Sequence, residues 1–152
     1  MFFISDSQVK THKFASSITE KFLIENETLI FLINGELGVG KTEFVKGVAS
    51  KLGFSHADIT SPTFVMVNEL ENNRYKMYHI DLYRVEKKFA RSIVYDLLEE
   101  TQFSLTNKKI VVCIEWANKL LKKREFKLNV GKVVMVDIKV SKNNIRTIKI
   151  KF

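Results

Sequence analysis

One glycine-rich segment of the sequence has the residue types and the spacing of a phosphate-binding loop. Residues 35–42 read G-E-L-G-V-G-K-T and match the pattern G-x-x-x-x-G-K-T. Glycines let successive backbone N–H groups turn toward an anion, and a helix that begins near Lys41 points its positive end at the same place. The predicted phosphate-binding residues are Gly35, Glu36, Leu37, Gly38, Val39, Gly40, Lys41, Thr42 and Glu43. Lys41 suits the β- and γ-phosphates of a nucleoside triphosphate, and the Thr42 hydroxyl suits Mg²⁺.

A carboxylate that could accompany the metal follows an apolar run over residues 110–114. Such a run is typical of a buried strand, so Glu115 is expected at the strand's carboxyl end, beside the loop. We predict Glu115 as a ligand of Mg²⁺ or as the base for an attacking water; a solvated glutamate is the alternative. Trp116 is the only tryptophan, and it is either close to the ligand or simply packed.

A third cluster, H-I-D-L-Y-R over residues 79–84, ends another predicted strand. Alternation along a strand places His79, Asp81 and Tyr83 on one face. These side chains could order a water or bridge to a metal, but the residues alone favour a polar network that closes a sheet edge. The segment S-P-T-F over 61–64 resembles a plain turn into a strand, with Thr63 as a sensor of the γ-phosphate as the alternative.

Hydrophobic periodicity predicts an α/β fold: a single P-loop domain, residues 1–152, with a mixed central sheet flanked by helices. The predicted elements, in chain order, are a helix over 7–25, a strand over 29–33, a helix over 41–52, strands over 63–70 and 74–82, a helix over 87–103, and strands over 110–114, 133–140 and 145–152.

Several single residues are expected to define the predicted helices. Ser5 or Asp6 is the expected N-cap of the first helix, and Gly53 is expected to end the second. Four-residue spacing places Phe14, Ile18 and Phe22 along one face of the first helix and aligns Phe89, Ile93 and Leu97 along one face of the third.

Length and composition indicate an ordinary globular protein. The chain has 152 residues, of which 45% are hydrophobic, and contains no apolar run close to the roughly 20 residues of a membrane span. Its start lacks a basic leader, and its single cysteine excludes a disulfide framework. We therefore expect a cytoplasmic protein in which Cys113 is a packing residue.

The chain is strongly basic, with 25 Lys and Arg against 17 Asp and Glu and a net charge of +8. Such a charge can attract RNA, but lysines spread over solvated faces would give the same value. Basic residues concentrate over 119–127 and over 139–151. No guanine-reading N-K-x-D or T-K-x-D tetrad occurs, which favours ATP over GTP.

Taken together, the glycine-rich loop, S-P-T-F, H-I-D-L-Y-R and I-E-W occur in an order that resembles the bacterial TsaE (YjeE) ATPases over nearly the whole chain. That family serves the pathway that makes threonylcarbamoyladenosine at position 37 of tRNAs. The resemblance implies an ATPase that hydrolyses ATP weakly alone and acts with a complex of the transferase subunit TsaD and its paralogue TsaB. It also implies contact with tRNA only indirectly, or through that complex.

The resemblance also implies roles for single residues. Lys41 would bind phosphates, Thr42 and Glu115 would bind Mg²⁺, and Asp81 would be needed for turnover. Residues expected near the nucleotide are Trp116, Arg146 and Thr11, the last near the adenine. One departure from the family pattern is the segment 86–96, which carries Lys87, Lys88 and Arg91 where an acidic pair and a glycine are usual.

Three other functions are compatible with the same residues. A small-molecule kinase would transfer the γ-phosphate to an acceptor other than water. A nucleotide-gated adaptor would bind ATP to hold partners together and hydrolyse it only incidentally. A direct RNA binder would show binding that depends steeply on salt.

Overall fold

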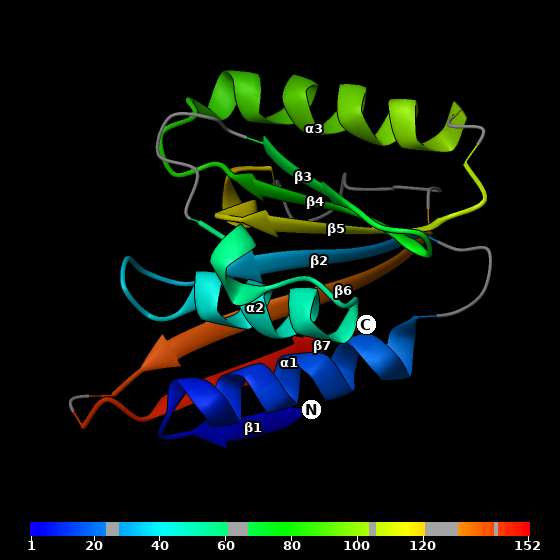
Figure 1. Cartoon of the computed structure of the whole chain (residues 1–152). Helices are drawn as coiled ribbons and strands as arrows, with labels where there is room; N and C mark the ends of the chain where they lie inside the picture. The colour runs from blue at the N-terminus through cyan, green and yellow to red at the C-terminus, as the bar shows by residue number, and fades with distance from the viewer. Residues whose placement is uncertain (24–27, 61–66, 104–105, 121–130, 142) are drawn as a thin grey trace.

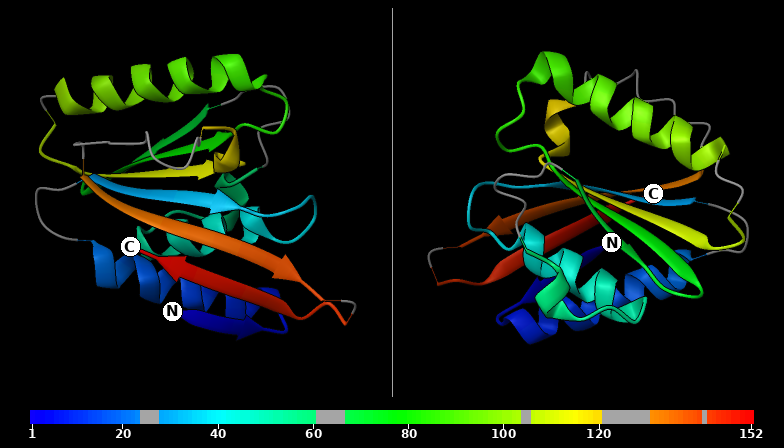
Figure 2. Two further views of the ribbon diagram at one scale, coloured as in Figure 1. Left: turned by 180° about the vertical axis from the view of Figure 1, so that it is seen from behind. Right: turned by 45° about the horizontal axis from the view of Figure 1, so that its top comes forward.

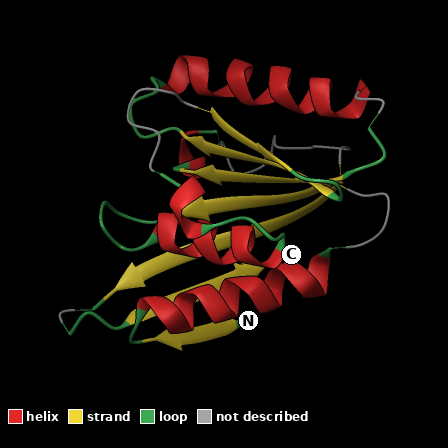
Figure 3. Ribbon diagram, viewed as in Figure 1, coloured by secondary structure: helices red, strands yellow, loops and turns green. Residues whose placement is uncertain are grey.

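The computed structural model describes residues 1–23, 28–60, 67–103, 106–120, 131–141 and 143–152. Within these ranges the chain forms one seven-stranded sheet with helices on both faces (Figure 3). The strands are β1 (Phe2–Ser5), β2 (Thr28–Asn34), β3 (Val67–Glu71), β4 (Tyr75–Asp81), β5 (Lys109–Glu115), β6 (Gly131–Val140) and β7 (Arg146–Lys151). The helices are α1 (Gln8–Phe22), α2 (Lys41–Lys51) and α3 (Lys87–Phe103), with 3-10 turns η1 (His56–Asp58) and η2 (Ala117–Lys119).

The sheet is mixed, as the sequence predicts. Its strand order is β1-β7-β6-β2-β5-β4-β3, and the four consecutive strands β6, β2, β5 and β4 run parallel to one another. The β3–β4 and β6–β7 hairpins are antiparallel, and β1 pairs antiparallel with β7. The parallel strands therefore end at one edge of the sheet, which lies at the left of Figure 1.

Two hydrophobic layers hold the helices onto the sheet. On β2, Leu29, Phe31 and Ile33 pack toward α1 and α2, while Ile30 and Leu32 belong to the layer under α3. Figure 2 shows the same arrangement from two other directions, with α3 on one side of the sheet and α1 and α2 on the other. A strand buried on both faces must be apolar at every position, which explains the continuous apolar run in the sequence.

Helices α1 and α2 pack closely because Gly47 lies at their crossing. A Cβ at this position would meet the His12 carbonyl oxygen at 2.5 Å and the Ala15 Cβ at 2.7 Å. The absence of a side chain therefore sets the distance between the two helices, and through it the position of α2 and the loop before it.

Most predicted elements are confirmed, with their ends shifted by a few residues. The helix over 87–103 has the predicted bounds, and the strands predicted over 133–140 and 145–152 form as β6 and β7. Gly53 ends α2 with a φ of +88°, as expected. The predicted strand over 63–70 is confirmed from Val67 onward, and residues 61–66 lie outside the described residues.

One expectation about local structure is wrong, and two further features were not predicted. The N-cap of α1 is Ser7, whose hydroxyl accepts from Lys10 N–H at 3.3 Å, because Ser5 is used in a strand instead. That strand, β1, has no prediction; its four residues have no clear period, and it exists because Phe2 to Ser5 pair with the distant β7. In α3 the buried positions include Ala90, Val94 and Leu98, each one residue after the aligned Phe89, Ile93 and Leu97. Ile93 and Leu97 are partly buried against the same layer, whereas Phe89 is 53% exposed.

Two further expectations concern the single cysteine and membrane-spanning segments. Cys113 is free and fully buried, as predicted for a packing residue. Burial raises the pKa of its thiol well above the usual value, so the group is neutral. Among the described residues, no helix is both long enough and apolar enough to span a bilayer.

Candidate nucleotide-binding site

The predicted site residues lie together at the end of the sheet where the parallel strands have their carboxyl ends. Strand β2 ends at Asn34 and leads into the glycine-rich loop, while the neighbouring β5 ends at Glu115, which is in register with Ile33. On the other side of β5, Asp81 at the end of β4 is in register with Glu115. The loop and the carboxyl ends of β4 and β5 thus lie at the same end of the sheet, as expected for ligand sites in parallel sheets (Figure 1).

The loop has the backbone conformation of an anion cradle. Gly35, Gly38 and Gly40 have φ values of +151°, +77° and +102°, which L side chains rarely adopt. A Cβ on Gly40 would also lie 2.9 Å from Arg146 Nε. The first backbone hydrogen bond of α2 runs from Phe44 N–H to the Gly40 carbonyl at 3.1 Å. The N–H groups of the preceding residues therefore lie before the helical ladder, where they can bind an anion.

Lys41 is held inside this edge rather than extended into solvent. Only 5% of the residue is exposed, and its Nζ donates to the carbonyl oxygens of Gly35 and Glu36 at 3.0 and 2.7 Å. The same Nζ lies 4.0 Å from the centre of the Trp116 ring. Burial lowers the pKa of the ammonium, and the charges of Glu115 and Asp81 oppose this shift. The cation is thus placed among the loop, an aromatic ring and two carboxylates.

Glu115 is buried and is held by a histidine. It is 2% exposed, and its Oε1 lies 2.9 Å from Nε2 of His79, a fully buried residue. His79 does not join Asp81 and Tyr83 in a network at a sheet edge, as the residues alone favoured. Strand β4 is an inner strand between β3 and β5, and alternation places His79 on the same face as Met77, in the layer under α1 and α2. The solvated-glutamate alternative for Glu115 is wrong.

Asp81, Tyr83 and Trp116 form the outer part of this side of the site. Asp81 Oδ1 accepts from Tyr83 N–H at 2.9 Å, which fixes the turn after β4. The Tyr83 and Trp116 rings are 5.0 Å apart. Trp116 has a φ of +59°, which is uncommon for a non-glycine residue. In this conformation its ring lies against the Lys41 ammonium.

The residues present fit a magnesium ion of the kind that P-loop proteins hold. Among the described residues, no group of three or more His, Cys, Asp or Glu side chains could enclose a metal. Magnesium in these sites needs fewer protein ligands, because phosphate oxygens and waters complete its octahedron. Thr42 supplies a hydroxyl directly after Lys41, and Glu115 Oε2 has no hydrogen-bond partner among the described residues.

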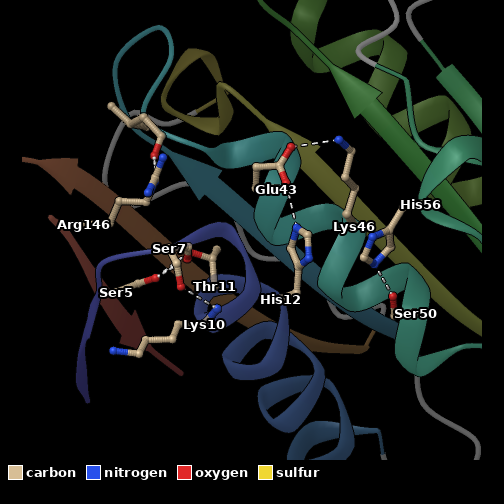
Figure 4. Close-up of polar contacts among 11 residues, drawn as sticks. Ser5, Ser7, Lys10, Thr11, His12, Glu43, Lys46, Ser50, His56 and Arg146 are labelled. Carbon is tan, nitrogen blue, oxygen red and sulfur yellow. Dashed lines mark hydrogen bonds and ion pairs between the residues drawn. The ribbon is translucent and has the colours of Figure 1, made fainter. Parts of the chain in front are cut away.

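Arg146 and Thr11 lie on the opposite side of the loop. Arg146, the first residue of β7, donates from Nε to the Val39 carbonyl oxygen at 3.0 Å, so it is bonded to the loop itself (Figure 4). Thr11 is fully buried, and its hydroxyl is hydrogen-bonded to the Ser5 hydroxyl at 2.8 Å and to the Ser7 carbonyl at 3.2 Å. Thr11 therefore joins β1 to α1, and its contact with an adenine stays a prediction.

Glu43 belongs to a polar network that joins α2 to α1. Its carboxylate accepts from Lys46 at 2.8 Å and lies 2.7 Å from His12 Nε2 (Figure 4). Burial alone would raise the pKa of Glu43, but the hydrogen bonds from Lys46 and His12 lower it below its usual value. His12 has no motif of its own, and His79 lies in the H-I-D-L-Y-R cluster without a predicted partner. Packing alone identifies the site residue that each histidine binds.

An open cavity of about 780 Å³ adjoins the loop, a volume within the range of small-molecule pockets. It is lined by loop residues Gly35, Glu36 and Val39, by Trp116, and by side chains of β6 and β7. Leu37, at the tip of the loop, is 70% exposed.

Other sequence candidates do not join the site or cannot be placed. Lys119 donates to the carbonyl oxygens of Leu82 and Val85 at 2.8 and 3.0 Å, so it fixes the β4–α3 connection. Thr63, and the basic residues Lys122, Lys123 and Arg124, lie outside the described residues.

Comparison with known proteins gives a consistent family. The family model described as "Threonylcarbamoyl adenosine biosynthesis protein TsaE" matches residues 5–148. Similar proteins include three named "tRNA threonylcarbamoyladenosine biosynthesis protein TsaE". The one from Borreliella burgdorferi is 41% identical over 57% of this chain and 58% of its own, and the one from Nostoc sp. is 34% identical over 66% and 60%. The one from Rickettsia typhi is 28% identical over 96% and 91%.

A solved structure has the same fold. Bacillus subtilis YdiB superposes with a TM-score of 0.65 and 23% identity, over 97% of this chain and 82% of that one. The matched segments span about 60% of the length of the Borreliella and Nostoc relatives, whereas the family match covers nearly all of this chain. The single-domain P-loop α/β fold and the family resemblance are confirmed: the chain belongs to the TsaE family of threonylcarbamoyl adenosine biosynthesis proteins.

Proposed function

We propose that this chain is a Mg²⁺-dependent ATPase that supports the threonylcarbamoyladenosine modification of tRNA at position 37, acting with the TsaD–TsaB transferase complex. The observation that carries the proposal is the placement of Lys41. Its ammonium is held by two loop carbonyls at 3.0 and 2.7 Å, and two carboxylates at the ends of neighbouring strands act on its pKa. The names of the relatives support the pathway.

The proposed roles follow from this geometry. Lys41 would exchange the Gly35 and Glu36 carbonyls for the β- and γ-phosphate oxygens of ATP, while the loop N–H groups bind the remaining charge. Thr42 and Glu115 would hold Mg²⁺, which neutralises charge that develops on the phosphates. Asp81, anchored through one oxygen by Tyr83 N–H, would orient the attacking water. Positioning and charge stabilisation carry most of phosphoryl transfer, so no covalent step on the protein is required.

The decisive experiment measures Mg²⁺-dependent phosphate release from ATP, by the chain alone and with its cognate TsaD–TsaB pair. We expect slow hydrolysis alone and a clear increase with the pair. Hydrolysis that is indifferent to the pair would leave the nucleotide site in place but contradict the role in tRNA modification.

The same assay separates the other functions. Transfer of the γ-phosphate to an acceptor other than water would indicate a kinase. Complex formation that requires ATP but continues with a non-hydrolysable analogue, at an unchanged rate of tRNA modification, would indicate an adaptor. Binding of tRNA by this chain alone, with affinity that falls steeply with salt, would indicate a direct RNA binder.

A further inference from the structure

His79 is a fully buried imidazole directly beneath the carboxyl edge of the sheet. It lies on β4 opposite Cys113 of β5, and Glu115 is two residues further along β5, on the same face as Cys113. A diagonal pair on adjacent strands is within reach of long side chains. The Cys113 thiol is neutral, because burial and the nearby Glu115 raise its pKa. Glu115 is therefore the polar side chain that His79 meets, at 2.9 Å.

The hydrogen bonds assign the proton on the His79 ring. Nε2 lies 2.9 Å from Glu115 Oε1, and Nδ1 is buried with no partner among the described residues. An ionised carboxylate can only accept, so Nε2 carries the proton and Nδ1 is a bare acceptor. The opposite tautomer would need a protonated Glu115 and would also leave a buried N–H donor unpaired. An imidazolium would also leave the Nδ1–H donor unpaired. A buried unpaired donor on a charged ring costs more free energy than a bare Nδ1 acceptor on a neutral ring.

This assignment divides the two oxygens of Glu115 between different tasks. Oε1 is bound to a side chain that is fully buried on an inner strand. Oε2 has no such partner among the described residues. The Lys41 ammonium is close enough for Glu115 to act on its pKa, yet it donates to the Gly35 and Glu36 carbonyls. A free glutamate would be drawn into a direct ion pair with Lys41.

We propose that His79 is a positioning residue: its Nε2–H holds Glu115 Oε1, which keeps the carboxylate away from Lys41 and leaves Oε2 for the magnesium ion. The inference rests on the proposed Mg²⁺–nucleotide function. Partners of metal ligands commonly change metal affinity by about 10- to 100-fold when they are removed.

The test measures the affinity for ADP by calorimetry, with and without Mg²⁺, and the Mg²⁺ concentration that gives half of the affinity gain. His79→Leu removes the donor and fills a similar volume. We expect about a tenfold or larger rise in that Mg²⁺ concentration, with little change in the affinity for ADP without metal. His79→Gln places an amide N–H near the position of Nε2 and should restore most of the effect. His79→Asn, which reaches only the position of Nδ1, should not.

A double variant distinguishes positioning from a purely structural role. If His79 acts through Glu115, then His79→Leu should add nothing to the Mg²⁺ defect of Glu115→Gln. Should His79→Leu fail to fold, the contrast between Gln and Asn gives the answer. Equal losses with and without Mg²⁺, or additive defects, would overturn the inference. If Mg²⁺ does not change the ADP affinity of the wild-type protein, the proposed function itself is wrong. If Mg²⁺ raises the affinity of the wild type and of His79→Leu alike, only the inference about His79 is wrong.

Discussion

The two sides of the phosphate loop are built in different ways. On the β4–β5 side, Glu115 is 2% exposed and is bonded to a fully buried histidine, and Trp116 covers Lys41 at 4.0 Å. On the α1–β7 side, Arg146 is half-buried and is bonded to a backbone carbonyl of the loop, and Glu43 is paired with two side chains at the protein surface.

This difference suits the two sides of the loop to different functions. Charges act most strongly where water is excluded, so the β4–β5 side is suited to stabilising charge during phosphoryl transfer. Partly solvated contacts are weaker, so the α1–β7 side is suited to shaping the loop and adjusting to a ligand. Substitutions on the β4–β5 side should therefore change function strongly, and those on the α1–β7 side should change it less.

The largest effect is expected from Lys41→Ala. Each hydrogen bond to a charged group is worth about 1.5–3 kcal/mol, so two lost phosphate contacts should weaken ATP binding by about 100-fold or more. Calorimetric titration with ATP measures this loss, and circular dichroism checks the fold. Lys51→Ala, at the far end of the same helix, is the matched control. Equal affinities for the two variants would contradict the assignment of Lys41.

Gly40→Ala should have the next largest effect. The residue has a φ of +102°, and the new Cβ would lie 2.9 Å from Arg146 Nε, so the loop must shift. We expect ATP affinity to fall by about tenfold or more, since small misplacements at a binding loop are costly. Gly53→Ala is the control: its φ of +88° gives similar backbone strain, but its Cβ would meet nothing closer than 3.7 Å. Gly53→Ala should lose stability and keep its ATP affinity.

Arg146→Ala should weaken ATP binding by less, about three- to tenfold, because it removes one partly exposed hydrogen bond to the loop. It should also relieve part of the Gly40→Ala defect, since the clash involves its own side chain. Titration of the two single variants and the double variant measures this coupling. Strictly additive losses would show that the Arg146 contact does not shape the loop.

The smallest effect is expected from Glu43→Gln, and it concerns stability. The pKa of Glu43 is depressed from 4.5 in the folded protein, so its contribution is present above that pH and lost as pH falls through the folded pKa. When the pH falls from about 6 to about 3, the free energy of unfolding should fall less in the variant than in the wild type. The difference between the two changes should be under about 1 kcal/mol. Urea midpoints at several pH values measure it. Glu20→Gln, in an exposed ion pair with Lys51, is the control; identical profiles for Glu43→Gln and wild type would contradict the prediction.

Much of the site was predictable because it depends on short-range patterns. The loop over 35–42 and its following helix are contiguous in the chain, and each glycine has a local conformational reason. Glu115 was predictable because the carboxyl ends of parallel strands meet at one edge. His79 was placed on the correct strand, but its partner was not predicted, because alternation gives a face and not the neighbouring strand.

Apolar periodicity and glycine conformation are local properties of the chain, and they specify the α/β class, the phosphate loop and the strand that ends at Glu115. The pairing of β1 with β7, the capping of α1 by Ser7 rather than Ser5, and the bond between His79 and Glu115 arise only in the folded chain. These features depend on contacts between residues far apart in the chain. Burial and strand register, which no local pattern encodes, select among the partners that each side chain could have had.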